Sequence, residues 1–309
     1  MNYSSKTELI HFLVQKRLAL KKRFGQNFLL NKAVCQRLVT LLAIKQTDTV
    51  WEIGPGLGAL TAELLERAQE VVAFEIDWGL IKALQELFPN NPHFKIIPGD
   101  AVKTIPKALA CLPGPDLIIG NLPYASSSQI IFCLTEVALK ARLLLFTVQR
   151  ELAARLTAKA GHKNLSAFSL ICQASFQIEK KFELAPGNFY PSPKVYSTVI
   201  ALKPRPLLGN PVLRNNFIRL VQTAFHSRRK TLANTLLKST SFTETERGIL
   251  LEGFEKLGIK PQTRAEELSL ATWLTLTQII SDKLSRTNLG EGLRPQPVGK
   301  ASGQSRPAH

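Results

Sequence analysis

The chain has 309 residues, of which 45% are hydrophobic, and its 40 Lys and Arg residues against 23 Asp and Glu give a formal net charge of +17. Such an excess of base favours a polyanionic partner, because a cationic surface gains free energy by releasing the counterions of phosphates. We find no apolar stretch long enough to span a membrane and no apolar secretory core at the N-terminus. The composition therefore predicts a nucleic-acid partner and no membrane association.

A predicted strand at residues 50–53 runs into a glycine-rich loop and then into a helical pattern. Glycines such as Gly54 and Gly56 let the backbone turn tightly and approach a ligand beside a helix N-terminus. The spacing also satisfies the dinucleotide fingerprint, with Ala59 in its last position, so the loop alone does not choose the cofactor. Glu52, two residues before the first glycine, favours S-adenosylmethionine, whose amino-acid end carries an ammonium group.

Two further predicted strands end in acidic residues. The strand at 71–74 is followed by Glu75, 21 positions after the first glycine of the loop, where α/β nucleotide sites hold an acid for ribose hydroxyls. Asp77 is a rival for this role, but it better caps the helix that begins at the next residue. The strand at 94–97 leads to Asp100, whose carboxylate is suited to accept a hydrogen bond from an adenine amino group.

A fourth predicted strand, at 117–119, precedes an Asn-Leu-Pro-Tyr segment. Asn121 offers an amide oxygen, Leu122 offers a backbone carbonyl before a proline, and Tyr124 offers a flat ring. This set suits an exocyclic amino group on a planar base, with two acceptors for its hydrogens and a ring to stack on its face. The alternative is a strand-end turn whose tyrosine packs in the core.

Each of these four predicted strands is followed by residues suited to bind a ligand. The four strand ends belong on the carboxyl edge of one parallel sheet, where open α/β folds bind ligands. We therefore predict an α/β, Rossmann-like domain, closed by a strand at 196–203 and followed by a smaller helical domain with helices near 244–257 and 265–280. The predicted organisation is a basic N-terminal extension at 1–22, this α/β domain at 23–205, a helical domain at 206–284 and a disordered tail at 285–309.

Taken together, these segments resemble the ribosomal RNA adenine N6,N6-dimethyltransferase family. The resemblance runs from about residue 23 to residue 274 and is carried by the segments at 24–29, 52–58, 74–77, 99–101, 120–124, 191–195 and 228–232. It implies an enzyme that uses S-adenosylmethionine to methylate N6 of two adjacent adenosines in a hairpin loop near the 3′ end of small-subunit rRNA. It also implies that the α/β domain at 23–205 is a methyltransferase domain and that the helical domain at 206–284 frames an RNA cleft. The implied substrate is a pre-ribosomal (pre-30S) particle, and we expect the protein to act as a monomer in ribosome biogenesis.

The resemblance also implies roles for individual cofactor residues. Asn27 and Leu29 would close over the cofactor, Gly54 would pass against its methionine end, Glu75 would hold the ribose and Asp100 would bind the adenine. The other implied cofactor residues are Glu52, Gly56 and Asn121.

For the target adenine, the implied residues are Asn121 and Leu122 as acceptors and Tyr124 as a stacking ring. Phe189 would flank the other face of the base, unless it packs in the core and Tyr190 takes its place. Arg228, Arg229 and Lys230 would contact RNA; for any single basic cluster, a solvated surface is the alternative.

The chain departs from the family pattern at three positions. Gln129 stands where Pro is usual, Asn164 where Gly is expected, and Tyr196 where Asp is usual. We expect these departures to change the loops that face RNA and to leave the cofactor pocket as it is.

Four cysteines show no metal-like spacing, so we expect reduced core residues in a cytoplasmic protein without a metal. Two other functions stay open. A dinucleotide (NAD)-dependent oxidoreductase would use the same glycine loop but would have no role for residues 121–124 or for the basic excess. A non-catalytic ribosome-assembly factor would bind RNA without needing the cofactor residues.

Overall fold

The computed structural model describes residues 3, 5–18, 25–137, 139–205 and 207–291. Contacts divide the chain into two compact units. The first comprises Met1–Gly209 with Glu266–Leu270, and the second comprises Asn210–Ala265 with Ala271–His309. The first unit thus ends a few residues beyond residue 205, where we expected the α/β domain to end, and it takes in the segment predicted to be an N-terminal extension.

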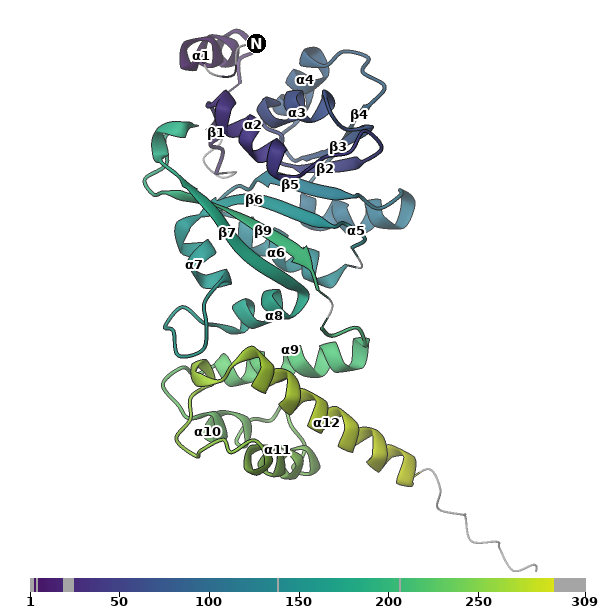
Figure 1. Cartoon of the computed structure of the whole chain (residues 1–309), viewed down its shortest axis with the longest axis vertical. Helices are drawn as coiled ribbons and strands as arrows, with labels where there is room; N and C mark the ends of the chain where they lie inside the picture. The colour runs from purple at the N-terminus through teal and green to yellow at the C-terminus, as the bar shows by residue number, and fades with distance from the viewer. Residues whose placement is uncertain (1–2, 4, 19–24, 138, 206, 292–309) are drawn as a thin grey trace, which may run out of the picture. The chain divides into compact units, whose positions relative to one another are not determined.

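A seven-stranded sheet, in the order β4-β3-β2-β5-β6-β9-β7, forms the centre of the first unit (Figure 1). The five strands from β4 to β6 pair in parallel, while β9 is antiparallel to both β6 and β7. This mixed sheet confirms the predicted α/β class. The strands are β2 (Thr49–Ile53), β3 (Glu70–Glu75), β4 (Phe94–Pro98), β5 (Leu117–Asn121), β6 (Leu143–Gln149), β7 (Phe176–Leu184) and β9 (Ser197–Pro204). A separate antiparallel pair is formed by β1 (Phe28–Leu29) and β8 (Phe189–Tyr190).

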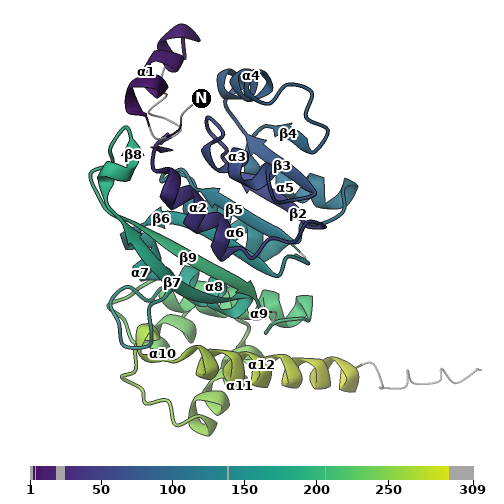
Figure 2. The same cartoon turned by 45° about the horizontal axis from the view of Figure 1, so that its top comes forward.

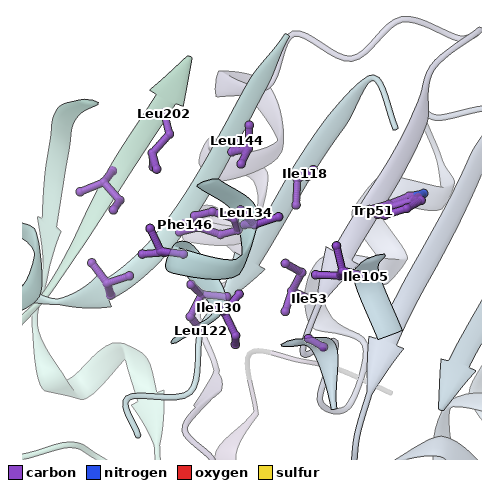
Figure 3. Packing of buried hydrophobic residues seen from close by; sticks show 14 of the residues in the cluster. Trp51, Ile53, Ile105, Ile118, Leu122, Ile130, Leu134, Leu144, Phe146 and Leu202 are labelled. Carbon is purple, nitrogen blue, oxygen red and sulfur yellow. The ribbon is translucent and has the colours of Figure 1, made fainter. Parts of the chain in front are cut away.

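Helices cover both faces of the sheet, because successive side chains of a buried strand point to opposite sides. Trp51 and Ile53 pack in one cluster, whereas Val50 packs in another. Figure 3 shows the first cluster, to which strands and the helices behind them both contribute. Helices α5 (Ala101–Cys111), α6 (Ser127–Glu136), α7 (Arg150–Leu156) and α8 (Ala167–Ser175) contribute to the first cluster, and α2 (Lys32–Leu41) and α3 (Ala59–Leu65) contribute to the second (Figure 2).

The N-terminal segment is part of the fold and not a basic extension beside it. Helix α1 (Lys6–Gln15) buries Leu9 and Leu13 in a third cluster, together with Phe28 and with Leu80 of α4 (Trp78–Leu87). The expected boundary at residue 22 is therefore wrong as a limit of the folded unit, because apolar side chains on α1 complete a core to which later segments contribute.

Helix α4 begins where we predicted, and the predicted cap forms. The side chain of Asp77 accepts a hydrogen bond from the backbone N–H of Gly79 at 2.9 Å. Glu75 is the last residue of β3, whereas Asp77 is the N-cap of α4. The two acidic residues therefore have different structural roles.

The cysteines have different environments. Cys35, Cys133 and Cys172 are buried, and burial raises the pKa of each thiol, to about 12 for Cys35. Cys111 is exposed at the end of α5, so the expectation that all four are core residues is wrong there.

The second unit is helical. Its core includes Phe217 of α9 and Leu250 of α11, and the ring of Trp273 in α12 lies 6.2 Å from that of Phe225. The helices are α9 (Pro211–Phe225), α10 (Leu232–Leu236), α11 (Glu244–Lys256) and α12 (Leu270–Glu291).

Two predicted boundaries in the second unit are wrong. The helix predicted from residue 265 is a short 3-10 turn (Ala265–Glu267) before α12, which begins at Leu270. Helix α12 continues to Glu291, past the predicted start of a disordered tail at 285, since no proline interrupts it there; residues 292–309 lie outside the described part of the chain. None of the helices in the described segments is long and apolar enough to cross a membrane.

Candidate functional site

A cavity of about 320 Å³ opens where β2, β3, β4 and β5 end, at the carboxyl edge of the sheet. This is within the usual size of a small-molecule site. The structure brings together here nearly all the residues predicted for cofactor and target. Those that line the cavity are Asn27, Leu29, Glu52, Gly54, Gly56, Glu75, Asp100, Asn121, Leu122 and Tyr124.

The glycine loop forms the wall between β2 and α3. Gly56 has φ +60°, a conformation that L side chains rarely adopt, and a Cβ at this position would lie 2.9 Å from the ring of Phe28. Its N–H donates to Oε2 of Glu75 at 3.3 Å, which joins the loop to the end of β3. Position 56 therefore requires glycine, because of its backbone conformation and because the Phe28 ring leaves no room for a Cβ.

Glu52 is a buried carboxyl group at the floor of the cavity, only 1% exposed. Its Oε2 accepts a hydrogen bond from the hydroxyl of Thr61 at 2.6 Å. Burial raises the pKa of Glu52 to about 8; the nearby Glu75 adds to this rise, whereas the hydrogen bond from Thr61 opposes it. No ion pair among the described residues includes Glu52. A ligand ammonium would supply the positive charge that this carboxylate lacks.

Glu75 is oriented by three backbone donors. Its Oε1 accepts from the N–H groups of Ile76 at 2.8 Å and Asp77 at 2.9 Å, and its Oε2 accepts from Gly56. Burial raises its pKa to about 7, although these hydrogen bonds oppose the shift. A carboxylate offers about four acceptor positions, so at least one is left for a ligand hydroxyl.

Asp100 caps helix α5 at the next strand end. Its Oδ1 accepts from the N–H of Val102 at 3.0 Å, so one oxygen is used by the cap and the other keeps its capacity to accept from a ligand. The sequence predicted Asp100 as a ligand group, and the structure shows that it also holds the helix start.

The amide of Asn121 has a fixed orientation. Its Nδ2 donates to the backbone carbonyl of Asn27 at 2.7 Å, and because a carbonyl can only accept, the NH₂ group must face it. The amide oxygen of Asn121 is therefore the part available to another donor. Asn27 itself is held by a 3.1 Å bond from its Nδ2 to the carbonyl of Gly25.

Tyr124 is half-buried beside Asn121. Its hydroxyl lies 2.6 Å from Oγ of Ser197, the first residue of β9, and burial raises its pKa. The hydroxyl is thus tied to the sheet, while the residue lines the cavity. Such an arrangement holds an aromatic side chain in a single position for stacking.

Phe189 does not line the cavity. Its side chain is 2% exposed and belongs to the buried cluster that includes Leu29, its partner in the β1–β8 pair, and Leu184. The predicted role of Phe189 on the second face of the target base is wrong for this structure, because apolar neighbours surround the ring. The sequence allowed core packing as the alternative.

Other cavity residues were not predicted. Tyr3 lines the cavity from the N-terminal segment, and burial raises the pKa of its hydroxyl, with Glu52 adding to the shift. Gln129 also lines the cavity, so the expectation that departures from the family pattern leave the cofactor pocket untouched is wrong at this position. Nothing in the sequence near Tyr3 signals such a role, whereas the departure at Gln129 was visible.

The predicted RNA-contact residues lie in the second unit. Arg228, Arg229 and Lys230 are exposed in the loop between α9 and α10. Lys230 lines a separate polar groove together with His226 and Lys238. The structure thus gives these side chains access to solvent, as a phosphate contact requires.

A Rossmann-like sheet with a glycine loop, two buried acids and an Asn-Leu-Pro-Tyr segment at its carboxyl edge is typical of an S-adenosylmethionine-dependent methyltransferase. The family model for ribosomal RNA adenine dimethylase matches residues 17–282. The chain belongs to this family, and it is therefore an S-adenosylmethionine-dependent rRNA adenine dimethyltransferase, which confirms the predicted enzyme class and cofactor.

Relatives and solved structures agree with this assignment. The chain is 37% identical to ribosomal RNA small subunit methyltransferase A of Borreliella afzelii, over 91% of this chain and 96% of that protein. It is 36% identical to the protein of the same name from Dehalococcoides mccartyi, over 84% and 88% of the two chains. A dimethyladenosine transferase from Plasmodium falciparum has a similar structure, with a TM-score of 0.72, 25% identity and coverage of 82% and 98%. The fold is also shared with the 23S rRNA methyltransferase ErmE, at a TM-score of 0.62 and 23% identity over 82% and 100% of the two chains.

Proposed function

We propose that this enzyme methylates N6 of two adjacent adenosines in a hairpin loop near the 3′ end of small-subunit rRNA. The observation that carries the proposal is the orientation of the Asn121 amide, whose NH₂ group donates to the carbonyl of Asn27 at 2.7 Å. The amide oxygen is therefore left to accept a hydrogen, and adenine N6 carries two of them. An acceptor fixed in this way selects an amino group over a ring nitrogen.

The chain's residues activate the amine by orientation. The N6 lone pair is delocalised into the purine ring and is a poor nucleophile. The amide oxygen of Asn121 would accept one N6 hydrogen and the carbonyl of Leu122 the other. These two hydrogen bonds would favour a pyramidal nitrogen whose lone pair points out of the plane of the ring. Tyr124, tied to Ser197, would stack on the base and hold its plane. No strong base is needed, since the proton can leave after the transfer.

The cofactor supplies a sulfonium methyl group as the electrophile when it is bound. In the proposed site, Glu52 holds the ammonium group, Glu75 the ribose hydroxyls and Asp100 the adenine amino group. Gly54, Gly56, Asn27 and Leu29 complete the contacts around it. The buried carboxyl group of Glu52, which has no ion-pair partner among the described residues, supports this arrangement, because an ammonium partner would offset the loss of hydration of its ionised form.

The target base must leave its stack to reach such a cavity. In the proposal, Arg228, Arg229 and Lys230 of the second unit contact RNA phosphates. The substrate is a pre-30S particle, the enzyme works as a monomer, and its place is the cytoplasm during ribosome biogenesis. Support for RNA as partner comes from the net charge of +17 and from the exposure of these three side chains.

Methyl transfer to undermethylated small ribosomal subunits tests the proposal, with mass spectrometry of the 3′ hairpin as the readout. We expect N6-dimethyladenosine with the wild type and a fall in kcat of roughly 10²–10³ for Asn121→Ala, as for the loss of one oriented polar group at a reacting centre. Asn215→Ala, at an exposed position on α9, is the matched control and should be fully active. Subunits that the wild type leaves unmodified would contradict the proposal and favour a non-catalytic assembly role.

A further inference from the structure

An exposed aromatic residue stands next to the cavity and has no role in the proposed reaction. Tyr196 is 45% exposed, and Val195 before it is 44% exposed. Most other large apolar side chains among the described residues are buried. Tyr196 is also the position at which the family resemblance leads us to expect an aspartate.

The backbone of Tyr196 is linked to the cavity through its neighbour Ser197, which contacts the cavity residue Tyr124. The next residue, Ser197, is fully buried, and its Oγ lies 2.6 Å from the hydroxyl of Tyr124. The carbonyl of Tyr196 accepts a hydrogen bond from the N–H of Arg150 at 3.0 Å. Tyr196 is thus one residue away from the group that holds the proposed stacking ring.

Arg150 lies at the same edge of the sheet as Asn121. It directly follows β6, and the pairing of Asn121 with Thr147 brings the ends of β5 and β6 together. Its guanidinium carbon is 5.4 Å from the centroid of the Tyr196 ring. This distance is within the range of a cation–π contact.

Two basic residues accompany Tyr196, Arg150 in space and Lys194 two positions before it in the chain. Arg150 and Lys194 are both exposed, and neither belongs to an ion pair among the residues that the structure describes. A cation on an aromatic ring can be a purely structural surface pair. Here, however, the pair lies at the sheet edge that carries Asn121 and adjoins the residue that bonds Tyr124. Single-stranded RNA is bound by aromatic rings that stack on bases next to basic groups that neutralise phosphates.

We propose that Tyr196 and Arg150 form a stacking subsite for the unpaired base next to the target adenosine, with Arg150 and Lys194 contacting the adjoining phosphates. The inference rests on the proposed function, since it assigns a second nucleotide of the same RNA. It also gives the departure from aspartate a physical consequence: an acid at this position would repel phosphate, whereas a tyrosine beside a cation attracts a base.

A synthetic RNA hairpin with 2-aminopurine next to the target adenosine tests the subsite. Stacking on an aromatic ring quenches 2-aminopurine, so we expect quenching on binding to the wild type and to Tyr196→Phe. Tyr196→Ala should lose the quenching and bind the hairpin roughly 5- to 100-fold more weakly, the range expected for the loss of one stacked base. Its KM for RNA should rise by a similar factor, with kcat at saturating RNA retained.

Leu251→Ala is the matched control, because it removes an exposed apolar side chain (48% exposed) from the second unit and should change neither quenching nor affinity. Cofactor affinity serves as the folding check for every variant. Equal quenching and affinity for Tyr196→Ala and the wild type would overturn the subsite while leaving methyl transfer intact. Conversely, Asn121→Ala should quench normally while its kcat for methylation falls by roughly 10²–10³. A wild type that quenches but methylates no rRNA would refute the proposed function and leave the subsite as an RNA contact.

Discussion

Replacing Glu52 by glutamine should change how stability depends on pH. Burial raises the pKa of this carboxyl to about 8, from an ordinary value near 4.5. Between these two values the native state keeps a proton that the unfolded state has released, so the free energy of unfolding falls as pH rises. The bound proton of Glu52 therefore makes its full contribution to the free energy of unfolding below about pH 4.5, and this contribution is lost as pH rises toward 8. Each pH unit removes about 1.4 kcal/mol, and the interval from pH 5.5 to 7.5 removes about 2–3 kcal/mol.

Glutamine has the shape of the protonated carboxyl and keeps an oxygen for the hydroxyl of Thr61, which donates at 2.6 Å in the wild type. It cannot ionise. We therefore expect the free energy of unfolding of Glu52→Gln, relative to that of the wild type, to rise by about 2–3 kcal/mol between pH 5.5 and pH 7.5. Glu75, whose pKa is also raised, stays in both proteins, so the difference between them reports Glu52 together with its interaction with Glu75.

The measurement is urea unfolding of the cofactor-free protein, followed by circular dichroism at pH 5.5, 6.5 and 7.5. Glu66→Gln is the control, since it makes the same chemical change at an exposed position at the end of α3, away from the cavity. If Glu52→Gln and the wild type show the same change in unfolding free energy between pH 5.5 and 7.5, the carboxyl is ionised in the native state and the reasoning is refuted.

Three further outcomes are expected. Gly120→Ala should reduce the free energy of unfolding by about 1–3 kcal/mol in urea, because its Cβ would lie 2.6 Å from the carbonyl oxygen of Ile53; an unchanged midpoint would contradict this. Gly56→Ala should weaken S-adenosylmethionine binding roughly tenfold in calorimetry, since φ is +60° and the Phe28 ring is too close, and wild-type affinity would show that the loop relaxes. Arg229→Ala should lower the slope of log affinity for RNA against log salt by roughly 0.7–1, whereas an unchanged slope would exclude a phosphate contact.

The sequence by itself determined the parts of the site that are local. A strand that ends in glycines, an acid at the end of the next strand and an Asn-Leu-Pro-Tyr turn each depend on a few consecutive residues. Their common edge follows from the rule that parallel strands present their carboxyl ends together. Gly54, Glu75, Asp100 and Asn121 therefore line one cavity, as predicted, although they come from four separate strand ends.

The tertiary structure alone decided which atoms of these residues are available. The orientation of the Asn121 amide is set by its hydrogen bond to the carbonyl of Asn27, 94 positions earlier. The hydroxyl of Tyr124 is hydrogen-bonded to Ser197, 73 positions later. Burial sets the raised pKa of Glu52, and apolar neighbours from distant segments enclose Phe189. Each effect depends on contacts between segments that the chain brings together only when it folds. A short sequence pattern does not include these distant partners. It therefore predicts which residues belong to the site but not how their side chains are oriented.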